Sequence, residues 1–174
     1  MGCNYRIRLA KQVDLLRLPE IERQAARRFI PFGLAKLFST ATTPVEDFEE
    51  GMAAGQLWVA ADPDDQPVGF ALASVVEDHA HLNELDVLPE HGRRGLGTAL
   101  VETACQWARG AGFSRITLTT LSHIPWHTPF YKRLGFRILR PEECSEIQRL
   151  LLSFEVGWGD YRRVMMCREL IRET

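Results

Sequence analysis

A glycine-rich turn between two regular runs constrains the fold of this chain more than any other feature. The letters GRRGLG at Gly92–Gly97 follow a strand-like run at His81–Leu88 and open a helical run at Gly95–Arg109. A helix N-terminus presents free N–H groups and a partial positive charge. Glycine allows a ligand to approach the backbone, and Arg93 and Arg94 add two cations. The pattern therefore predicts a phosphate site at this turn.

The order of the glycines separates this turn from two other phosphate-binding loops. It reads G-x-x-G-x-G, whereas the dinucleotide fingerprint is G-x-G-x-x-G and a P-loop requires Gly-Lys followed by Ser or Thr. This order, with a hairpin expected upstream, argues against a dinucleotide-binding oxidoreductase. Taken alone, the turn also fits an ordinary strand-to-helix connection with solvated arginines.

The other runs predict a mixed α/β (α+β) fold. Asp14 is the expected N-cap of the first helix. Thr43 is expected to cap the second helix, where Pro44 and Glu46 complete a capping box. Because three strands precede the glycine-rich turn, a mixed sheet with helices on both faces fits better than strict β-α-β alternation, in one domain over residues 1–174. We expect strands at Tyr5–Leu9, Gln56–Ala61, Val68–Val76, His81–Leu88, Ser114–Leu121, Phe136–Leu139 and Arg163–Leu170, and helices at Asp14–Phe29, 43–55, Gly95–Arg109, Pro129–Leu134 and Glu142–Phe154.

Composition argues against several classes of function. Lys and Arg number 21 against 23 Asp and Glu in 174 residues, a formal net charge of −2, so no basic surplus supports nucleic-acid binding. No run approaches the ~20 apolar residues of a membrane span, and the first residues do not resemble a signal peptide, so we expect a cytoplasmic protein that binds no membrane. The four cysteines form no C-x-x-C pair, and His79 and His81 lack a third ligand nearby, so we expect no metal.

Two motifs together carry a resemblance to a known family. The strand before the turn ends at Val87, Pro89 follows, and Arg94–Gly97 reads R-G-L-G. Further on, a short helical run carries Tyr131 and closes on Gly135-Phe136. These residues resemble the GNAT acyltransferase superfamily, in which a Gln/Arg-x-x-Gly-x-Gly/Ala turn is followed by a Tyr-x-x-x-Gly-Phe element. The resemblance implies a single GNAT-like domain with a mostly antiparallel central sheet flanked by helices.

The resemblance implies acetyl-CoA (coenzyme A) as cosubstrate, no metal, and transfer of the acetyl group to an amine by direct attack. Two positions depart from the family pattern. Gly92 occupies the usual Gln or Arg position, and Pro125–His127 lies where many members have an Asn that contacts the pantetheine arm. The cofactor contacts that the resemblance implies are Val87, Leu88, Arg93, Arg94, Gly95, Leu96, Gly97, Thr98, His127 and Tyr131.

The resemblance also assigns catalytic roles. Tyr131 is the expected general acid, because a phenol with an unperturbed pKa of ~10 is protonated at neutral pH. The alternative is that its ring only packs in the core. Glu84 is the expected base, against a water chain or an ordinary polar-face carboxylate. The backbone N–H near Val87 or Leu88 is the expected oxyanion donor.

The acceptor is less constrained. The resemblance implies a small-molecule or peptide amine, and polyamines, antibiotics, amino acids and protein N-termini all stay open. It is also compatible with a homodimer. The alternative function is a non-catalytic acyl-CoA-binding regulatory module, which the departures at Gly92 and His127 would suit. The side chains expected to wall the acceptor site are Phe29, Phe32, Leu34, Leu37, Phe38, Trp126, Trp158 and Tyr161.

Overall fold

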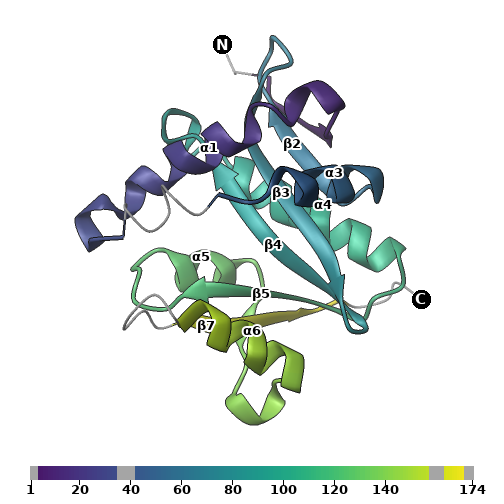
Figure 1. Cartoon of the computed structure of the whole chain (residues 1–174), viewed down its shortest axis with the longest axis vertical. Helices are drawn as coiled ribbons and strands as arrows, with labels where there is room; N and C mark the ends of the chain where they lie inside the picture. The colour runs from purple at the N-terminus through teal and green to yellow at the C-terminus, as the bar shows by residue number, and fades with distance from the viewer. Residues whose placement is uncertain (1–3, 35–41, 157–162, 171–174) are drawn as a thin grey trace. The chain divides into compact units, whose positions relative to one another are not determined.

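The computed structural model describes residues 4–34, 42–156 and 163–170 (Figure 1). Two compact units are distinguished, one comprising Met1–Ser74 and Asn83–Trp107 and the other Val75–Leu82 and Ala108–Thr174. Among the described residues, seven strands form one sheet in the order β1-β2-β3-β4-β5-β7-β6. The prediction of one domain over the whole chain stays a prediction.

The strands of the first unit form an antiparallel series. β1 (Arg6–Leu9) pairs with β2 (Leu57–Ala61), and β2 pairs with β3 (Pro67–Val76), both antiparallel. The expected hairpin is therefore confirmed. β4 (His79–Val87) follows β3 in the sheet and leads into the glycine-rich turn. A Cβ atom at Gly69 of β3 would lie 2.8 Å from the carbonyl oxygen of Asp86, so the glycine allows β3 to approach the end of β4 closely.

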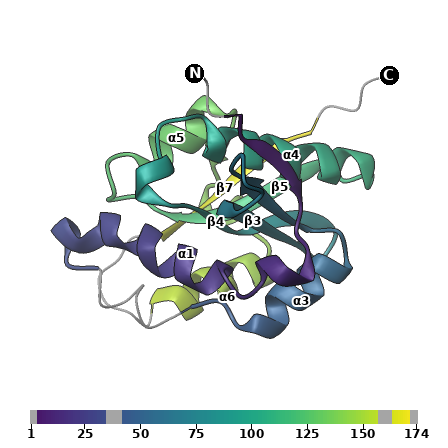
Figure 2. The same ribbon diagram turned by 90° about the horizontal axis from the view of Figure 1, so that it is seen from above.

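Helices cover both faces of the strands in the first unit, as Figure 2 shows. Phe48 packs edge-on against Phe70 of β3, with ring centroids 5.4 Å apart, while Trp58 of β2 lies 5.9 Å from Trp107 on the opposite face. All of β2 is buried, as expected for a strand covered on both sides. The helices are α1 (Leu18–Ala25), the 3-10 helix Ala26–Phe32, α3 (Val45–Ala53) and α4 (Leu96–Gly110).

The prediction that Asp14 caps the first helix is wrong. Asp14 instead ends a short 3-10 turn, where it accepts a 2.7 Å hydrogen bond from the Lys11 amide. It also forms a buried ion pair with Arg8, in which Nη1 and Nη2 donate at 2.6 and 3.0 Å. α1 begins only at Leu18, with a proline in its first turn. The carboxylate is committed to β1, so it does not reach the start of α1.

The predicted capping box of the second helix is also wrong, although the helix itself is present. The amide and hydroxyl of Thr43 donate to the Glu22 carboxylate of α1, at 2.9 and 3.3 Å. Pro44 is the N-cap of α3 and forms no side-chain cap hydrogen bond. The helix ends at Ala53, before Gly55 with its φ of +68°, as expected. Thr43 therefore ties α3 to α1 rather than capping α3.

The second unit is built on the long antiparallel pair of β5 and β7. The two strands pair from Arg115 opposite Glu169 to Leu121 opposite Arg163, and β6 adds to the other edge of β7. Within this unit β4 pairs parallel with β5 from Ala80 to Leu82. Helices α5 and α6 lie on opposite sides of β5 and β7 (Figure 2). The elements are β5 (Arg115–Leu121), α5 (His127–Arg133), β6 (Arg137–Ile138), α6 (Glu146–Val156) and β7 (Arg163–Glu169).

Two helix starts in the second unit differ from the sequence prediction. α5 begins at His127 rather than Pro129, so His127 lies inside the helix. α6 begins at Glu146 rather than Glu142, because Ser145 and Gln148 form a reciprocal cap. The Gln148 amide donates to the Ser145 hydroxyl at 3.1 Å, and the Ser145 amide donates to Oε1 of Gln148 at 3.0 Å.

The fold class is confirmed as a mixed, mostly antiparallel sheet flanked by helices. The element order also agrees with the sequence prediction. In the part of the chain that the structure describes, no helix is both long and apolar enough to span a membrane.

Candidate active site

The glycine-rich turn connects β4 to α4 through a backbone with two left-handed residues. Arg93 has a φ of +58° and Gly95 a φ of +80°. A left-handed conformation is uncommon for an arginine, and such outliers cluster at ligand-binding sites. The first helical hydrogen bond runs from the Ala99 amide to the Gly95 carbonyl, at 2.9 Å. The amides of Leu96, Gly97 and Thr98 precede it and so have no partner within the helix.

The turn also carries positive charge, and Tyr5, just before β1, packs against it. Arg93 and Arg94 are exposed, and Arg93 forms no hydrogen bond or ion pair within the described ranges. The Arg94 guanidinium lies over the Tyr5 ring, 5.8 Å from its centroid. The Tyr5 hydroxyl lies 2.8 Å from Nδ1 of His91. Tyr5 was missed from the sequence, because its contact spans 86 residues and leaves no local pattern.

Backbone N–H and C=O groups at the end of β4 point alternately to the two edges of the strand. The Leu88 amide donates to the Val68 carbonyl of β3 at 2.9 Å. Since N–H and C=O directions alternate along a strand, the Val87 amide and carbonyl point to the opposite edge of β4. Of the two expected oxyanion donors, Leu88 is therefore already bonded to β3. Glu84 and Asp86, which share a face by the same alternation, are both half-buried.

Asp86 and Glu22 of α1 form a cluster of carboxylates that hold their protons unusually tightly. Burial raises the pKa of Asp86 to about 8, the charge of Glu22 adds to the increase, and Arg28 only partly opposes it. Burial also raises the pKa of Glu22, against the opposing effect of hydrogen bonds from Thr43. The Asp86 carboxyl forms no side-chain hydrogen bond with any described residue. No local sequence pattern marks this environment, because α1 creates it.

In the second unit, α5 carries the expected acid. The Tyr131 ring is half-buried and packs edge-on against Phe130 and Phe136, with centroids 5.0 and 5.8 Å away. The Phe136 amide donates to the Tyr131 carbonyl at 3.0 Å, and Gly135 closes the helix with a φ of +83°. This closure holds the phenol ring in a fixed place at the end of α5.

His127 lies one helical turn before Tyr131, so the two side chains share a face of α5. Its Nδ1 lies 3.0 Å from Oγ1 of Thr120 on β5, and Trp126 packs edge-on against its ring. The structure thus brings His127 and Tyr131 together within the second unit. Glu84, Val87, Leu88 and 93–98 belong to the first unit.

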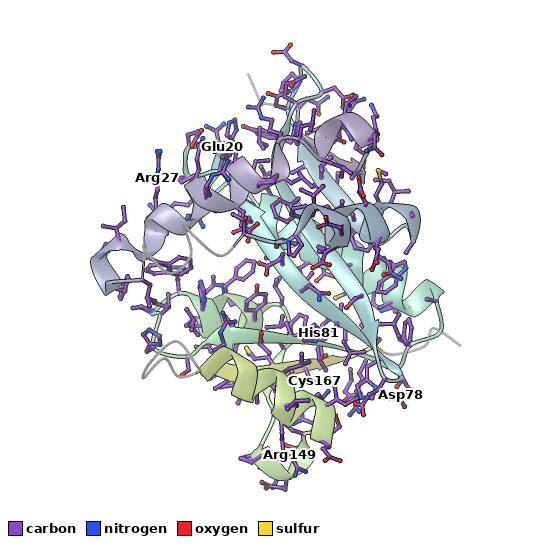
Figure 3. All side chains as sticks on the ribbon, viewed as in Figure 1. Glu20, Arg27, Asp78, His81, Arg149 and Cys167 are labelled. Atoms are coloured by element: carbon purple, nitrogen blue, oxygen red, sulfur yellow. The ribbon has the colours of Figure 1, made fainter. Side chains whose placement is uncertain are left out.

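The two histidines of β4 have partners other than a metal. Figure 3 labels His81, whose Nδ1 lies 2.8 Å from Oγ1 of Thr117. Burial, and the charge of His79, lower the pKa of His81 to about 4. His79 contacts Asp78 and Arg115. Within the described residues, no group of three potential ligands is arranged to hold a metal ion.

The expected acceptor wall is only partly described. Phe29 and Phe32 are half-buried in the 3-10 helix Ala26–Phe32, and Leu34 is buried. Trp126 is exposed. Leu37, Phe38, Trp158 and Tyr161 lie outside the described residues.

The fold and the turn together define the class of protein. A mixed sheet whose β4 leads through a glycine-rich, cationic turn into α4 is the arrangement expected for the GNAT superfamily from the two motifs. The model of the Acetyltransferase (GNAT) family matches residues 19–136. The chain belongs to this family.

Curated relatives agree with this assignment. The chain is 30% identical over 103 residues to the peptidyl-lysine N-acetyltransferase YjaB of Salmonella typhimurium, covering 59% of this chain and 63% of the relative. It is 30% identical over 106 residues to the YjaB protein of Escherichia coli, covering 60% of this chain and 66% of the relative. The match thus spans a little under two thirds of either relative.

Solved structures share the fold at low sequence identity. The PaiA N-acetyltransferase from Thermoplasma acidophilum, in complex with coenzyme A, superposes with a TM-score of 0.67 at 17% identity, covering 95% of this chain and 99% of that chain. The ribosomal-protein-S18-alanine N-acetyltransferase from Escherichia coli gives a TM-score of 0.69 at 18% identity, covering 98% and 97%. These likenesses concern the fold.

Proposed function

We propose that this chain transfers an acetyl group from acetyl-CoA to an amine. The observation that carries the proposal is the turn between β4 and α4, where Arg93 and Gly95 are left-handed and the first amides of α4 have no helical partner. An anion is stabilised at such a position by hydrogen bonds and by the helix dipole. Membership of the Acetyltransferase (GNAT) family makes a coenzyme A pyrophosphate the expected anion.

The proposed cofactor contacts fall into three groups. Amides from Gly95 to Thr98 hold the pyrophosphate, and Arg93 and Arg94 balance its charge. The edge of β4 at Val87 that points away from β3 receives the pantetheine arm, with the apolar side chain of Leu88 beside it. His127 and Tyr131, on one face of α5, contact the arm near the thioester.

The reaction requires three catalytic groups from the chain: a general base, an oxyanion donor and a general acid. The amine nitrogen attacks the thioester carbon after a proton leaves it, and Glu84 takes that proton. Because the Leu88 amide is bonded to Val68, we assign the oxyanion to the Val87 amide. Collapse of the tetrahedral intermediate breaks the C–S bond, and the Tyr131 hydroxyl protonates the leaving thiolate.

The base assignment has a competitor on the same strand. Asp86 is also half-buried, and its raised pKa means that it holds a proton at neutral pH. A base that is already protonated is a poor acceptor, which favours Glu84. Glu84→Gln should therefore lower kcat strongly at pH 7, whereas Asp86→Asn should leave kcat near the wild-type value. The reverse result would move the base to Asp86.

The acceptor to be tried first is a peptide lysine. The YjaB relatives are named peptidyl-lysine N-acetyltransferases, and the S18-alanine enzyme shares the fold. A panel of lysine peptides, N-terminal peptides, polyamines and amino acids, with thiol release and product mass as readouts, tests the proposal. Binding of acetyl-CoA without turnover of any acceptor would favour the non-catalytic acyl-CoA-binding module instead.

Tyr131→Phe tests the acid role most directly. The substitution removes one oxygen and keeps the ring against Phe130 and Phe136. We expect kcat to fall by roughly 10²–10⁴-fold, as loss of general-acid assistance typically does. The calorimetric Kd for acetyl-CoA should change little. Wild-type kcat at every pH would show that Tyr131 is structural and that water protonates the thiolate.

A further inference from the structure

Gly92 is a glycine because of its neighbours and not because of its backbone conformation. Its φ of −64° and ψ of 163° are open to any residue, so the glycine is not needed for conformation. A Cβ atom at this position would nevertheless lie 2.9 Å from Nη2 of Arg28 and 3.1 Å from the Pro89 carbonyl oxygen. Both separations are shorter than a comfortable non-bonded contact. The missing side chain at Gly92 therefore leaves room for a guanidinium.

Arg28 reaches this space from a distant part of the chain. It belongs to the 3-10 helix Ala26–Phe32, which continues α1, and Figure 3 labels its neighbour Arg27 there. Its Nη2 donates a long hydrogen bond of 3.5 Å to the Val87 carbonyl. That carbonyl lies on the edge of β4 that points away from β3, where the Val87 amide also points. One guanidinium thus contacts the end of the strand and the start of the turn.

The charge of Arg28 is felt at the same place. Burial and Glu22 raise the pKa of Asp86, and Arg28 is the cation that opposes them. Arg28 is therefore close enough to the end of β4 to act on it electrostatically, as well as through Val87 and Gly92. Arginine suits such a position because its planar fork contacts several groups at once and stays ionised.

We propose that Arg28 is a positioning residue for the cofactor turn, which supplies from another helix the side chain that Gly92 lacks. The family usually has Gln or Arg at this position of the turn. This chain has Gly92 there, and the Arg28 guanidinium occupies the space where a side chain would begin. The guanidinium holds Val87 and Gly92 at a fixed separation and so keeps the turn open for a pyrophosphate. The proposal rests on the proposed binding of coenzyme A at this turn.

The test is a mutant cycle read by calorimetric titration of coenzyme A, with thermal unfolding in parallel. Arg28→Ala should weaken Kd by roughly tenfold, because the turn loses the charge-assisted hydrogen bond that orders it before coenzyme A binds. Gly92→Ala should weaken it to a similar degree, because the new methyl displaces the guanidinium. The double substitution should bind no more weakly than Arg28→Ala alone, since the displaced group is already absent. Arg28→Ala combined with Gly92→Gln should regain most of the lost affinity.

Arg27→Ala is the matched control, because Arg27 is an exposed arginine in the same 3-10 helix. It should leave Kd unchanged. If Arg28→Ala also binds as the wild type does, or if the two single effects simply add in the double variant, the proposal is overturned while the turn remains the cofactor site. If the wild type itself does not bind coenzyme A, both the proposed function and the proposed role of Arg28 are contradicted. Should Arg28→Ala not fold, Gly92→Ala alone decides, and unchanged affinity in that variant contradicts the proposal.

Discussion

The first unit contains two acidic regions in which the pKa of the carboxyl groups is shifted in opposite directions. Beside β1, Asp14 and Asp65 are surrounded by cations: Arg8 bonds both, and Lys11 adds a 2.7 Å ion pair to Asp65. Hydrogen bonds from Lys11 and Arg8 hold the pKa of Asp65 well below its usual range. We call this group, Arg8, Lys11, Asp14 and Asp65, the β1 ion cluster.

The Asp86 carboxyl, at the C-terminal end of β4, has no comparable set of ion-pair partners among the described residues. Burial and the neighbouring Glu22 raise its pKa, and Arg28 offsets only part of the increase. Ionising Asp86 therefore costs stability, whereas ionising Asp14 adds to it. The β1 ion cluster therefore stabilises the fold at neutral pH. At the end of β4, by contrast, a carboxyl whose ionisation is destabilising lies next to the turn that we assign to the cofactor.

Asp14→Asn should have the largest effect on stability. It leaves Arg8 without its buried partner, and removing one member of a buried pair typically costs about 3 kcal/mol or more. Burial would raise the pKa of Asp14, but Arg8 and Lys11 lower it below its usual value. The stabilisation is thus present above the unfolded pKa and lost as the pH falls through the lower folded pKa.

Urea denaturation at pH 7 and pH 3 checks this prediction. The gap between wild type and Asp14→Asn should be large at pH 7 and should shrink at pH 3. Coenzyme A affinity should not change at pH 7, because the substitution lies away from the turn. Equal unfolding free energies at pH 7 would show that the β1 ion cluster is not structural.

Asp86→Asn should have a smaller effect, with the opposite dependence on pH. The raised folded pKa means that the contribution of Asp86 is fully present below its unfolded pKa and is lost as the pH rises through the folded pKa. Asparagine does not ionise, so the variant should gain on the wild type by at least about 1 kcal/mol at pH 9 and should match it near pH 4. Denaturation curves across this range provide the measurement. A difference that does not change with pH would contradict the account of Asp86.

Arg93→Ala and Arg94→Ala should have the smallest effects. Both side chains are exposed, so each contributes roughly 1 kcal/mol or less, and salt screens the contribution. Coenzyme A affinity should fall by roughly threefold at low salt and less at high salt. Arg109→Ala, an exposed change in the last turn of α4, is the control and should show no salt-dependent loss. An effect that is the same at both ionic strengths would show that the arginines act other than by charge.

Much of this arrangement could be predicted from the sequence, because it depends on neighbours along the chain. The continuous apolar run at Leu57–Ala61 and the polar turn after it are local signals, and so are the glycines that open and close α4. The strand–turn–helix that we assign to the cofactor belongs to this group. Motif spacing then linked it to the Tyr131 element, and the family match supports that link.

The errors came from side chains whose partners lie far along the chain. Asp14 and Thr43 have the chemistry of helix caps, but Arg8 and Glu22 compete for them through the tertiary fold. Tyr5 and Arg28 support the turn from 86 and 59 residues away in the sequence, and no periodicity marks such contacts. The sequence therefore predicts where the turn lies, and the fold decides what holds it.

The central claim is that the start of α4 binds the cofactor, and Gly97→Asp tests it most directly. A carboxylate in the first turn of a helix favours the helix dipole, so the fold should be as stable as the wild type or slightly more so. The same charge would repel a pyrophosphate and obstruct its approach to the amides. Gly110→Asp, at the other end of α4 where a new Cβ meets nothing within 4 Å, is the matched control. We predict that calorimetry with acetyl-CoA shows Kd weakened by roughly 100-fold or more in Gly97→Asp and unchanged in Gly110→Asp. Wild-type affinity in a folded Gly97→Asp protein would place the phosphate site elsewhere and contradict the account.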